Sequence, residues 1–199
     1  MRTSRIGAPV PATDPDRPAP PPIRRDAEDN RRRILRAAHE SFRERGLDLP
    51  MAVVARRSGV GTATLYRRFP TKDALVMELF ADSAAQYAKV FDAALAHADP
   101  WGGMEYALRR CCILQVEGRV CSPEFTARFP SHAERHAREG REKLAAVLDR
   151  ARGAGAVRAG ITTDDVEMLF EAVGGLAASD EPHRRAQRLV SHLLASFAA

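Results

Sequence analysis

Apolar residues along most of this chain recur every three or four positions, which is the spacing of one face of an α-helix. The first such run includes Ile34, Ala38 and Phe42, and predicts a helix over about residues 26–45. Gly46, directly after this run, is a typical C-terminal stop. Strict alternation of apolar and polar residues does not persist over the length of a strand, so the pattern predicts an all-α fold.

Two short helices are predicted next, on either side of a glycine-bearing turn. Pro50 fits the first turn of a helix that ends at Gly59. The second helix, residues 62–69, places Leu65 and Phe69 on one side and polar, partly basic residues on the others. In this arrangement the second helix can lie in a DNA major groove while the first braces it. Helical hairpins with a glycine turn also occur in proteins that never touch DNA, so the spacing alone leaves both readings open.

Longer helices are predicted for the rest of the chain. Thr71 is a good N-cap for a helix that starts at Lys72. Its apolar spacing continues to the break at Asp99-Pro100, so one long helix or two joined end to end both fit. Further helical runs follow over about residues 101–120, 123–129, 131–152, 163–176 and 182–197, with Ser131 expected to cap the third of these.

The N-terminal segment differs in composition from the rest. Seven prolines lie within residues 1–22, with almost no apolar periodicity. Such a stretch cannot bury enough surface to offset its chain entropy, so we expect residues 1–24 to form a disordered arm. The basic residues at the end of this arm and just beyond it are expected to contact a phosphate or enter a minor groove: Arg24, Arg25, Arg31, Arg32 and Arg33.

Positive charge is concentrated in the N-terminal third. Residues 1–70 hold 15 Arg against 8 acidic residues, a balance of +7, and the other 129 residues hold 16 basic against 18 acidic residues, a balance of −2. This charge attracts a phosphate backbone, although a solvated basic surface without a partner gives the same pattern. The absence of a long apolar run or signal peptide predicts a cytoplasmic protein with no membrane partner.

Catalytic and metal-binding patterns are weak. The chain has no GxSxG, HExxH, P-loop or GxGxxG motif, which argues against an enzyme. His132 and His136 stand four apart, a spacing able to hold a metal, but a solvated basic face explains them better, and we expect no metal or other cofactor. Cys111, Cys112 and Cys121 form no CxxC pair, so we expect reduced, buried thiols, with oxidant sensing as the alternative.

A specific resemblance comes from residues 59–75, GVGTATLYRRFPTKDAL, which resemble the signature of the tetracycline-repressor (TetR) family. Upstream, ILRAA at residues 34–38 resembles the first helix of that family, and VARRS at residues 54–58 resembles its second. One departure is Gly61, where family members often carry a Ser that caps the next helix. Since Gly is a tolerable N-cap, we expect that helix to form.

This resemblance implies a three-helix DNA-binding domain over residues 25–71 and a helical effector-binding and dimerisation domain over residues 72–199. It further implies a homodimer on a palindromic duplex operator, released by an unknown small molecule; a regulator without such a ligand is the alternative. The residues matched to DNA contacts are Thr62, Ala63, Arg67 and Arg68 for bases, and Thr64, Tyr66 and Lys72 for phosphates. Alternatively, the ring of Tyr66 only covers a core edge, or one of the arginines pairs with an acid of the first helix.

The resemblance also places an effector pocket within the bundle and a dimer face on the last two helices. Larger or softer side chains that are candidates for the pocket are Trp101, Met104, Tyr106, Leu108, Cys111, Cys112, Gln115, Phe125, Phe129, Met168 and Phe170, although most are expected to be ordinary core. The candidate dimer residues are Val166, Leu169, Val173, Leu176, Leu189, Leu193 and Phe197. The alternative interpretation is that these side chains pack in the core of their own chain.

Overall fold

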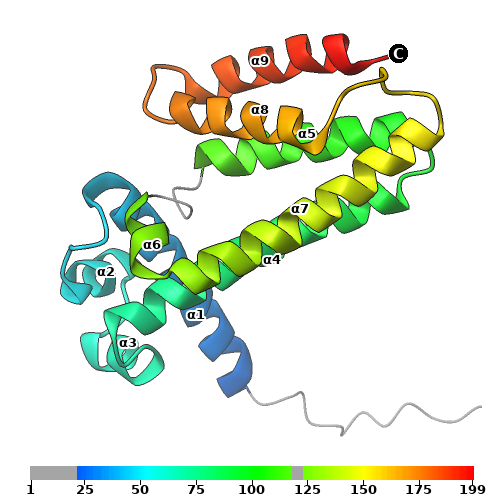
Figure 1. Cartoon of the computed structure of the whole chain (residues 1–199). Helices are drawn as coiled ribbons and strands as arrows, with labels where there is room; N and C mark the ends of the chain where they lie inside the picture. The colour runs from blue at the N-terminus through cyan, green and yellow to red at the C-terminus, as the bar shows by residue number, and fades with distance from the viewer. Residues whose placement is uncertain (1–21, 118–122) are drawn as a thin grey trace, which may run out of the picture.

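The computed structural model describes residues 22–117 and 123–199, and every secondary-structure element named in these two ranges is a helix (Figure 1). The only strand-like pairing within them is a single antiparallel bridge between Val157 and Ala198. The predicted all-α fold is therefore confirmed. Most of the predicted disordered arm, residues 1–21, lies outside the described residues.

Three helices form one end of the molecule, which we call the head: α1 (Pro22–Arg45), α2 (Met51–Ser58) and α3 (Thr62–Arg68) (Figure 1). Their apolar faces share a core built around Ile34, Val54 and Leu65, each no more than 1% exposed. Helix α1 begins four residues earlier than predicted, because a proline is tolerated in the first turn of a helix. Pro50, predicted inside α2, is instead its N-cap, with extended backbone angles.

One continuous helix, α4 (Lys72–Ala96), connects the head to the rest of the chain, which decides between the two alternatives left open by the spacing. The Thr71 hydroxyl caps it by accepting a hydrogen bond from the Ala74 N–H at 3.0 Å, as predicted. Its first half contributes Leu75 and Phe80 to the head core. Its second half contributes residues such as Phe91 to a separate core, so both ends of α4 are packed.

The second core belongs to what we call the body, formed by α5 (Pro100–Glu117), α7 (Pro130–Gly153), α8 (Thr163–Leu176) and α9 (Pro182–Phe197). Helices α8 and α9 lie over α5 at the opposite end of the molecule from α2 and α3 (Figure 1). The short α6 (Pro123–Arg128) packs differently, because its Phe125 stacks on Phe80 in the head core, with ring centroids 4.1 Å apart.

Two helix starts in the body show how local chemistry sets the boundaries. The prediction that Ser131 caps α7 is wrong: Phe129 is the N-cap and Pro130 takes the first helical position, where its missing N–H costs nothing. Helix α8 begins with a capping box in which Thr162 and Asp165 satisfy each other's backbone N–H groups. Across the described ranges, no helix combines the length and apolar character that crossing a membrane requires.

Candidate nucleic-acid interface

The corner between α2 and α3 depends on backbone conformation at two glycines. Gly59 ends α2 at φ +64°, in the left-handed region that favours glycine, and its N–H donates to the Arg56 carbonyl at 3.3 Å. Gly61 is the N-cap of α3 and offers no side chain, yet its carbonyl accepts the Leu65 N–H at 3.0 Å. Helix α3 therefore forms as expected without the capping serine.

A side chain of α1 holds this corner from outside. Arg33 Nη2 donates to the Ser58 carbonyl at 2.9 Å and to the Gly59 carbonyl at 3.2 Å. A Cβ at position 59 would lie 2.8 Å from the same nitrogen, so a larger residue there would displace the Arg33 guanidinium from these carbonyls. Sequence reasoning missed this role, because it placed Arg33 among the arginines that contact phosphate.

Arg31 likewise faces protein. Its Nε donates to Glu78 of α4 at 2.8 Å, and Nη1 lies 3.3 Å from Glu28 of α1. The ion pair with Glu78 connects α1 to the first half of α4, whereas the ion pair with Glu28 lies within α1. The structure thus gives both guanidinium groups partners within the chain, Arg31 in ion pairs and Arg33 on backbone carbonyls, and the phosphate contacts expected of them stay a prediction.

Helix α3 turns its apolar side inward and its polar side to solvent. Leu65 and Phe69 are 0% and 4% exposed, and they anchor the helix to the head core. All seven residues matched to DNA contacts reach the surface: Thr62, Ala63, Tyr66, Arg67 and Arg68 are exposed, and Thr64 and Lys72 are partly exposed. Tyr66 is 45% exposed, so a large part of its ring is open to solvent.

Two acids near the end of α1, Glu40 and Glu44, are paired with α2 and not with α3. Arg57 forms two hydrogen bonds with the Glu44 carboxylate, at 2.6 and 2.8 Å, and a third with Glu40 at 3.0 Å. The hydrogen bond from Arg57 holds the pKa of Glu44 below its ordinary value. Within the described part of the chain Arg67 and Arg68 have no ion-pair partner, so their charges remain available to an outside anion.

Two cavities in the described part of the chain bear on the predicted effector pocket. The larger, which we call the cleft, has a volume of about 1210 Å³ and lies between α1, α4 and the ends of α5 to α8. Of the predicted pocket residues, Gln115, Phe125 and Phe170 line the cleft. Met104, Leu108 and Cys111 are at most 1% exposed and belong to the body core. Four others line neither cavity: Trp101, Tyr106, Phe129 and Met168.

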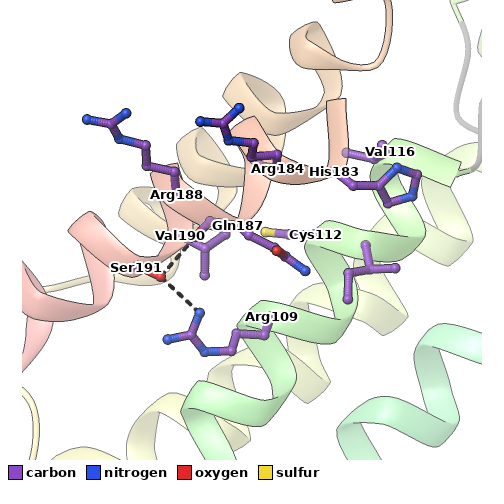
Figure 2. Close-up of a pocket in the computed structure, with 11 residues that line it drawn as sticks. Arg109, Cys112, Val116, His183, Arg184, Gln187, Arg188, Val190 and Ser191 are labelled. Atoms are coloured by element: carbon purple, nitrogen blue, oxygen red, sulfur yellow. Dashed lines mark hydrogen bonds between the residues drawn. The ribbon is translucent and has the colours of Figure 1, made fainter. Parts of the chain in front are cut away.

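The smaller cavity, which we call the groove, has a volume of about 340 Å³ and lies between α5 and α9 (Figure 2). Cys112 lines its floor, while several cationic side chains surround it. Arg109 of α5 points across to α9 and donates to the Ser191 hydroxyl at 3.0 Å, which closes one side (Figure 2). The groove is thus a small, polar-edged gap between two packed helices.

The predicted dimer residues divide into two groups. Val166, Leu169 and Val173 are at most 2% exposed and Phe197 is 4% exposed, so these side chains pack inside their own chain. The other three, Leu176, Leu189 and Leu193, are only partly buried against the body core. The open face of α8 instead carries Met168, which is 59% exposed, with Ala172 and Gly175 at the spacing of one helical face.

Cys111, Cys112 and His136 contact apolar side chains. Cys111 and Cys112 are buried free thiols, as expected, and burial raises the pKa of Cys112 to about 12. Cys121 lies outside the described residues. His136 packs edge-on against Phe80, with centroids 4.6 Å apart, and burial lowers its pKa. Among the described residues, no three His, Cys, Asp or Glu side chains gather as metal ligands.

Family models match both parts of this chain. The model described as bacterial regulatory proteins, tetR family, matches residues 34–79, which span α2, α3 and parts of α1 and α4. The model described as transcriptional regulator SbtR-like, C-terminal domain, matches residues 122–195. The chain belongs to the tetR family. Membership confirms the resemblance seen in residues 59–75 and assigns the chain to helix-turn-helix regulatory proteins rather than to enzymes.

Individual tetR-family relatives are similar over different lengths. An HTH-type transcriptional regulator of Staphylococcus aureus (strain USA300) is 43% identical over 54 residues, 27% of this chain and 29% of that protein. The aligned part thus spans less than a third of that relative's length. A TetR transcriptional regulator from Streptomyces coelicolor is 26% identical, with a TM-score of 0.67 over 84% of this chain and 98% of that one. A TetR transcription regulatory protein from Mycobacterium vanbaalenii is 26% identical, with a TM-score of 0.63 over 89% of this chain and 100% of that one.

Proposed function

We propose that this chain is a sequence-specific repressor that binds a palindromic DNA operator as a homodimer and is released by a small molecule. The observation that carries the DNA-binding part is the outward face of α3, where Tyr66, Arg67 and Arg68 are exposed beside a rigid glycine corner. Arginine can make bidentate bonds to guanine, and hydroxyl groups or Lys72 can hold backbone oxygens. Arg67 and Arg68 form no ion pair within the described residues, and the nearest acids at the end of α1, Glu40 and Glu44, are paired with Arg57.

The cleft supports release by a small molecule. It is bounded by α1 of the head and by α5, α7 and α8 of the body, so a ligand inside it contacts both parts of the chain. A ligand that fits one relative position of head and body better than another shifts the population toward that position. Two recognition helices of a dimer would then no longer match half-sites about one helical turn apart.

A cysteine-based redox sensor is less well supported. The thiolate is the reactive form of cysteine, and burial raises the pKa of Cys112 to about 12 and that of Cys111 as well. At neutral pH both groups are therefore protonated and shielded from oxidants. These contacts favour a packing role for the two residues.

The decisive experiment is selection of bound duplexes from a random pool by the full chain, followed by affinity measurements on the selected site. Arg67→Ala and Arg68→Ala are expected to lower affinity by about 5- to 150-fold and to relax sequence choice. Tyr66→Ala is expected to weaken binding to every duplex by a similar factor, because it removes a backbone contact. Arg138→Ala and Tyr106→Ala are matched controls, since both residues are exposed on the body. Failure to enrich any sequence, together with equal affinities for all five variants, would refute the DNA-binding part.

A further inference from the structure

We propose that the cleft takes an uncharged, largely apolar molecule carrying a hydrogen-bond acceptor, which the side-chain amide of Gln115 binds. This assignment rests on the effector-binding role proposed above and specifies the class of effector. Three features of the cleft carry it: an apolar inner wall, one oriented amide on that wall, and the balance of charges at the rim.

The inner wall is apolar and rich in aromatic rings. Phe91 and Leu114 line it from α4 and α5, and Phe170 lines it from α8. Phe125 adds a ring from α6 that is also part of the head core. At about 1210 Å³ the cleft has room for a ligand of drug size, whose apolar surface these side chains would remove from water.

Two side-chain amides line the cleft: the exposed Gln86, whose N–H groups donate to Asp82, and the half-buried Gln115, which is oriented by a residue of α4. The Tyr87 hydroxyl of α4 donates to Gln115 Oε1 of α5 at 3.0 Å, so the amide oxygen is already engaged. Among the described residues, no protein acceptor lies within hydrogen-bond reach of Gln115 Nε2, and the half-buried side chain lines the cleft. The amide therefore presents N–H donors and recognises an acceptor such as a carbonyl or ether oxygen.

Gly174 of α8 makes the room for this amide. A Cβ at position 174 would lie 3.2 Å from Gln115 Nε2, tighter than an ordinary contact. The glycine has an ordinary helical conformation in the middle of α8, where it costs stability relative to alanine. Its benefit at this position is space for the Gln115 side chain.

The charges around the cleft disfavour an anionic ligand. Six carboxylates line it against four Arg and Lys side chains. Arg141 is paired with Asp164 and Glu167, and Lys143 is paired with Asp92. Of the two histidines on the wall, His136 lies beside Phe80, and burial lowers the pKa of both. Arg32 is paired with Glu28, whereas Arg36 is exposed and has no ion pair among the described residues. An anion buried in the cleft away from Arg36 would lack a cationic partner, and burial of an unpaired charge is costly.

A cation would also lose its hydration in the inner part of the cleft. Most of the carboxylates lie at the solvent-exposed rim, and several are already paired, as Glu167 is with Arg141 and Asp82 is with Arg31. The wall around Gln115 offers a donor, which repels a cation and attracts a neutral acceptor. The cleft as a whole therefore fits an uncharged ligand best.

The test uses four probes of one skeleton, with the neutral dye Nile red as a fluorescent reporter displaced from the full chain. Benzophenone carries a neutral carbonyl, diphenylmethane lacks it, 4-benzoylbenzoate adds an anion and 4-(aminomethyl)benzophenone adds a cation. We expect benzophenone to compete best and to exceed diphenylmethane by about 3- to 10-fold, the effect of one hydrogen bond. Gln115→Leu should abolish that difference, and Gly174→Ala should reduce it by displacing the amide.

Gln187→Leu is the matched control, because Gln187 lines the groove and not the cleft. Thermal unfolding of each variant confirms that it is folded before its binding is compared. A charged probe that competes as well as benzophenone, or a carbonyl preference unchanged in Gln115→Leu, would overturn the assignment. Because no DNA is present, this failure is distinct from failure of the proposed function, which the duplex selection measures without any probe.

Discussion

The two buried serines of the head have opposite hydrogen-bonding states. Ser41 of α1 is 1% exposed, and its hydroxyl finds no partner among the described residues. Ser58 at the end of α2 donates to the Ala55 carbonyl at 2.9 Å and accepts the Val60 N–H at 3.4 Å. An unsatisfied buried hydroxyl destabilises the folded state, whereas a bonded one does not.

Ser41→Ala is therefore expected to raise the free energy of unfolding by about 1 kcal/mol, helped by the higher helix propensity of alanine. Ser58→Ala is expected to lower it by about the same amount. Urea denaturation of the two variants beside the unaltered chain gives both values. Destabilisation by Ser41→Ala would mean that its hydroxyl is bonded in solution.

At the residue scale, the sequence predicted which side chains of the candidate interface point outward. It did not predict which hydrogen bonds within the chain hold the corner between α2 and α3. Helical spacing alone places Leu65 and Phe69 inward and Tyr66 outward, which the structure bears out. The role of Arg33 depends on carbonyls 25 and 26 positions away along the chain. Partners at that separation leave no periodic signal, so a run of arginines looks like a free basic surface.

At the scale of elements, the helix-turn-helix depends on a contact from outside it. Arg33→Ala removes both hydrogen bonds to the corner carbonyls. We expect about 1 kcal/mol of lost stability, since the contact is partly exposed, and a fall of about 10-fold in operator affinity from a less well-ordered α3. Fluorescence anisotropy at several salt concentrations is the measurement.

The slope of affinity against salt identifies the cause. Loss of a phosphate contact lowers the slope by about one, whereas loss of a positioning contact leaves it unchanged. We expect an unchanged slope for Arg33→Ala. Arg138→Ala is the matched control, because Arg138 is exposed on α7 of the body. A reduced slope for Arg33→Ala would support its assignment as a phosphate ligand.

The capping box of α8 makes a pH-dependent contribution to stability. Hydrogen bonds from the Thr162 hydroxyl and backbone N–H lower the pKa of Asp165. A carboxylate with a depressed pKa stabilises the folded state above its unfolded value, near 3.9, and the stabilisation is lost as pH falls through the folded pKa. Asp165→Asn is therefore expected to be less stable than the unaltered chain at about pH 6 and to approach it below about pH 3.

Urea midpoints across this pH range, with Asp180→Asn as the exposed control, measure the effect. A constant difference between Asp165→Asn and the unaltered chain at every pH would contradict the role of the ionised carboxylate. The start of α8 was readable from Thr163 and the acids that follow it. The start of α7 was not, because Ser131 and Pro130 are both start signals and only the packed structure decides between them.

At the scale of the whole molecule, the proposed dimer should depend on the open face of α8. We expect Met168→Arg to convert a dimer into a chain of 21.8 kDa at micromolar concentration, since it places a charge in the middle of that face. Ala146→Arg, on the exposed side of α7, should leave the mass unchanged. Sedimentation equilibrium gives the mass directly. A dimer that survives Met168→Arg would locate the interface elsewhere.

Periodicity could not separate body core from body surface completely. Val166, Leu169 and Val173 form the stripe that looked suited to a partner, but they are used inside the chain. Met168 lies with Ala172 and Gly175 on the open face of the same helix, and it looked suited to a pocket. The sequence alone does not show whether the stripe or Met168 packs against the body core. That depends on how α5 and α9 are placed around α8.

Because α4 is one unbroken helix, a change in its tilt moves both ends of the molecule together. Its 25 residues span about 37 Å, and each half is anchored in a different core. A tilt of about 5° around the midpoint would move either end by about 1.6 Å, more than half the length of a hydrogen bond. In the proposed dimer, a displacement of that size would be enough to pull the arginines proposed to bind bases off the base edges, although no side chain near the proposed ligand approaches the DNA.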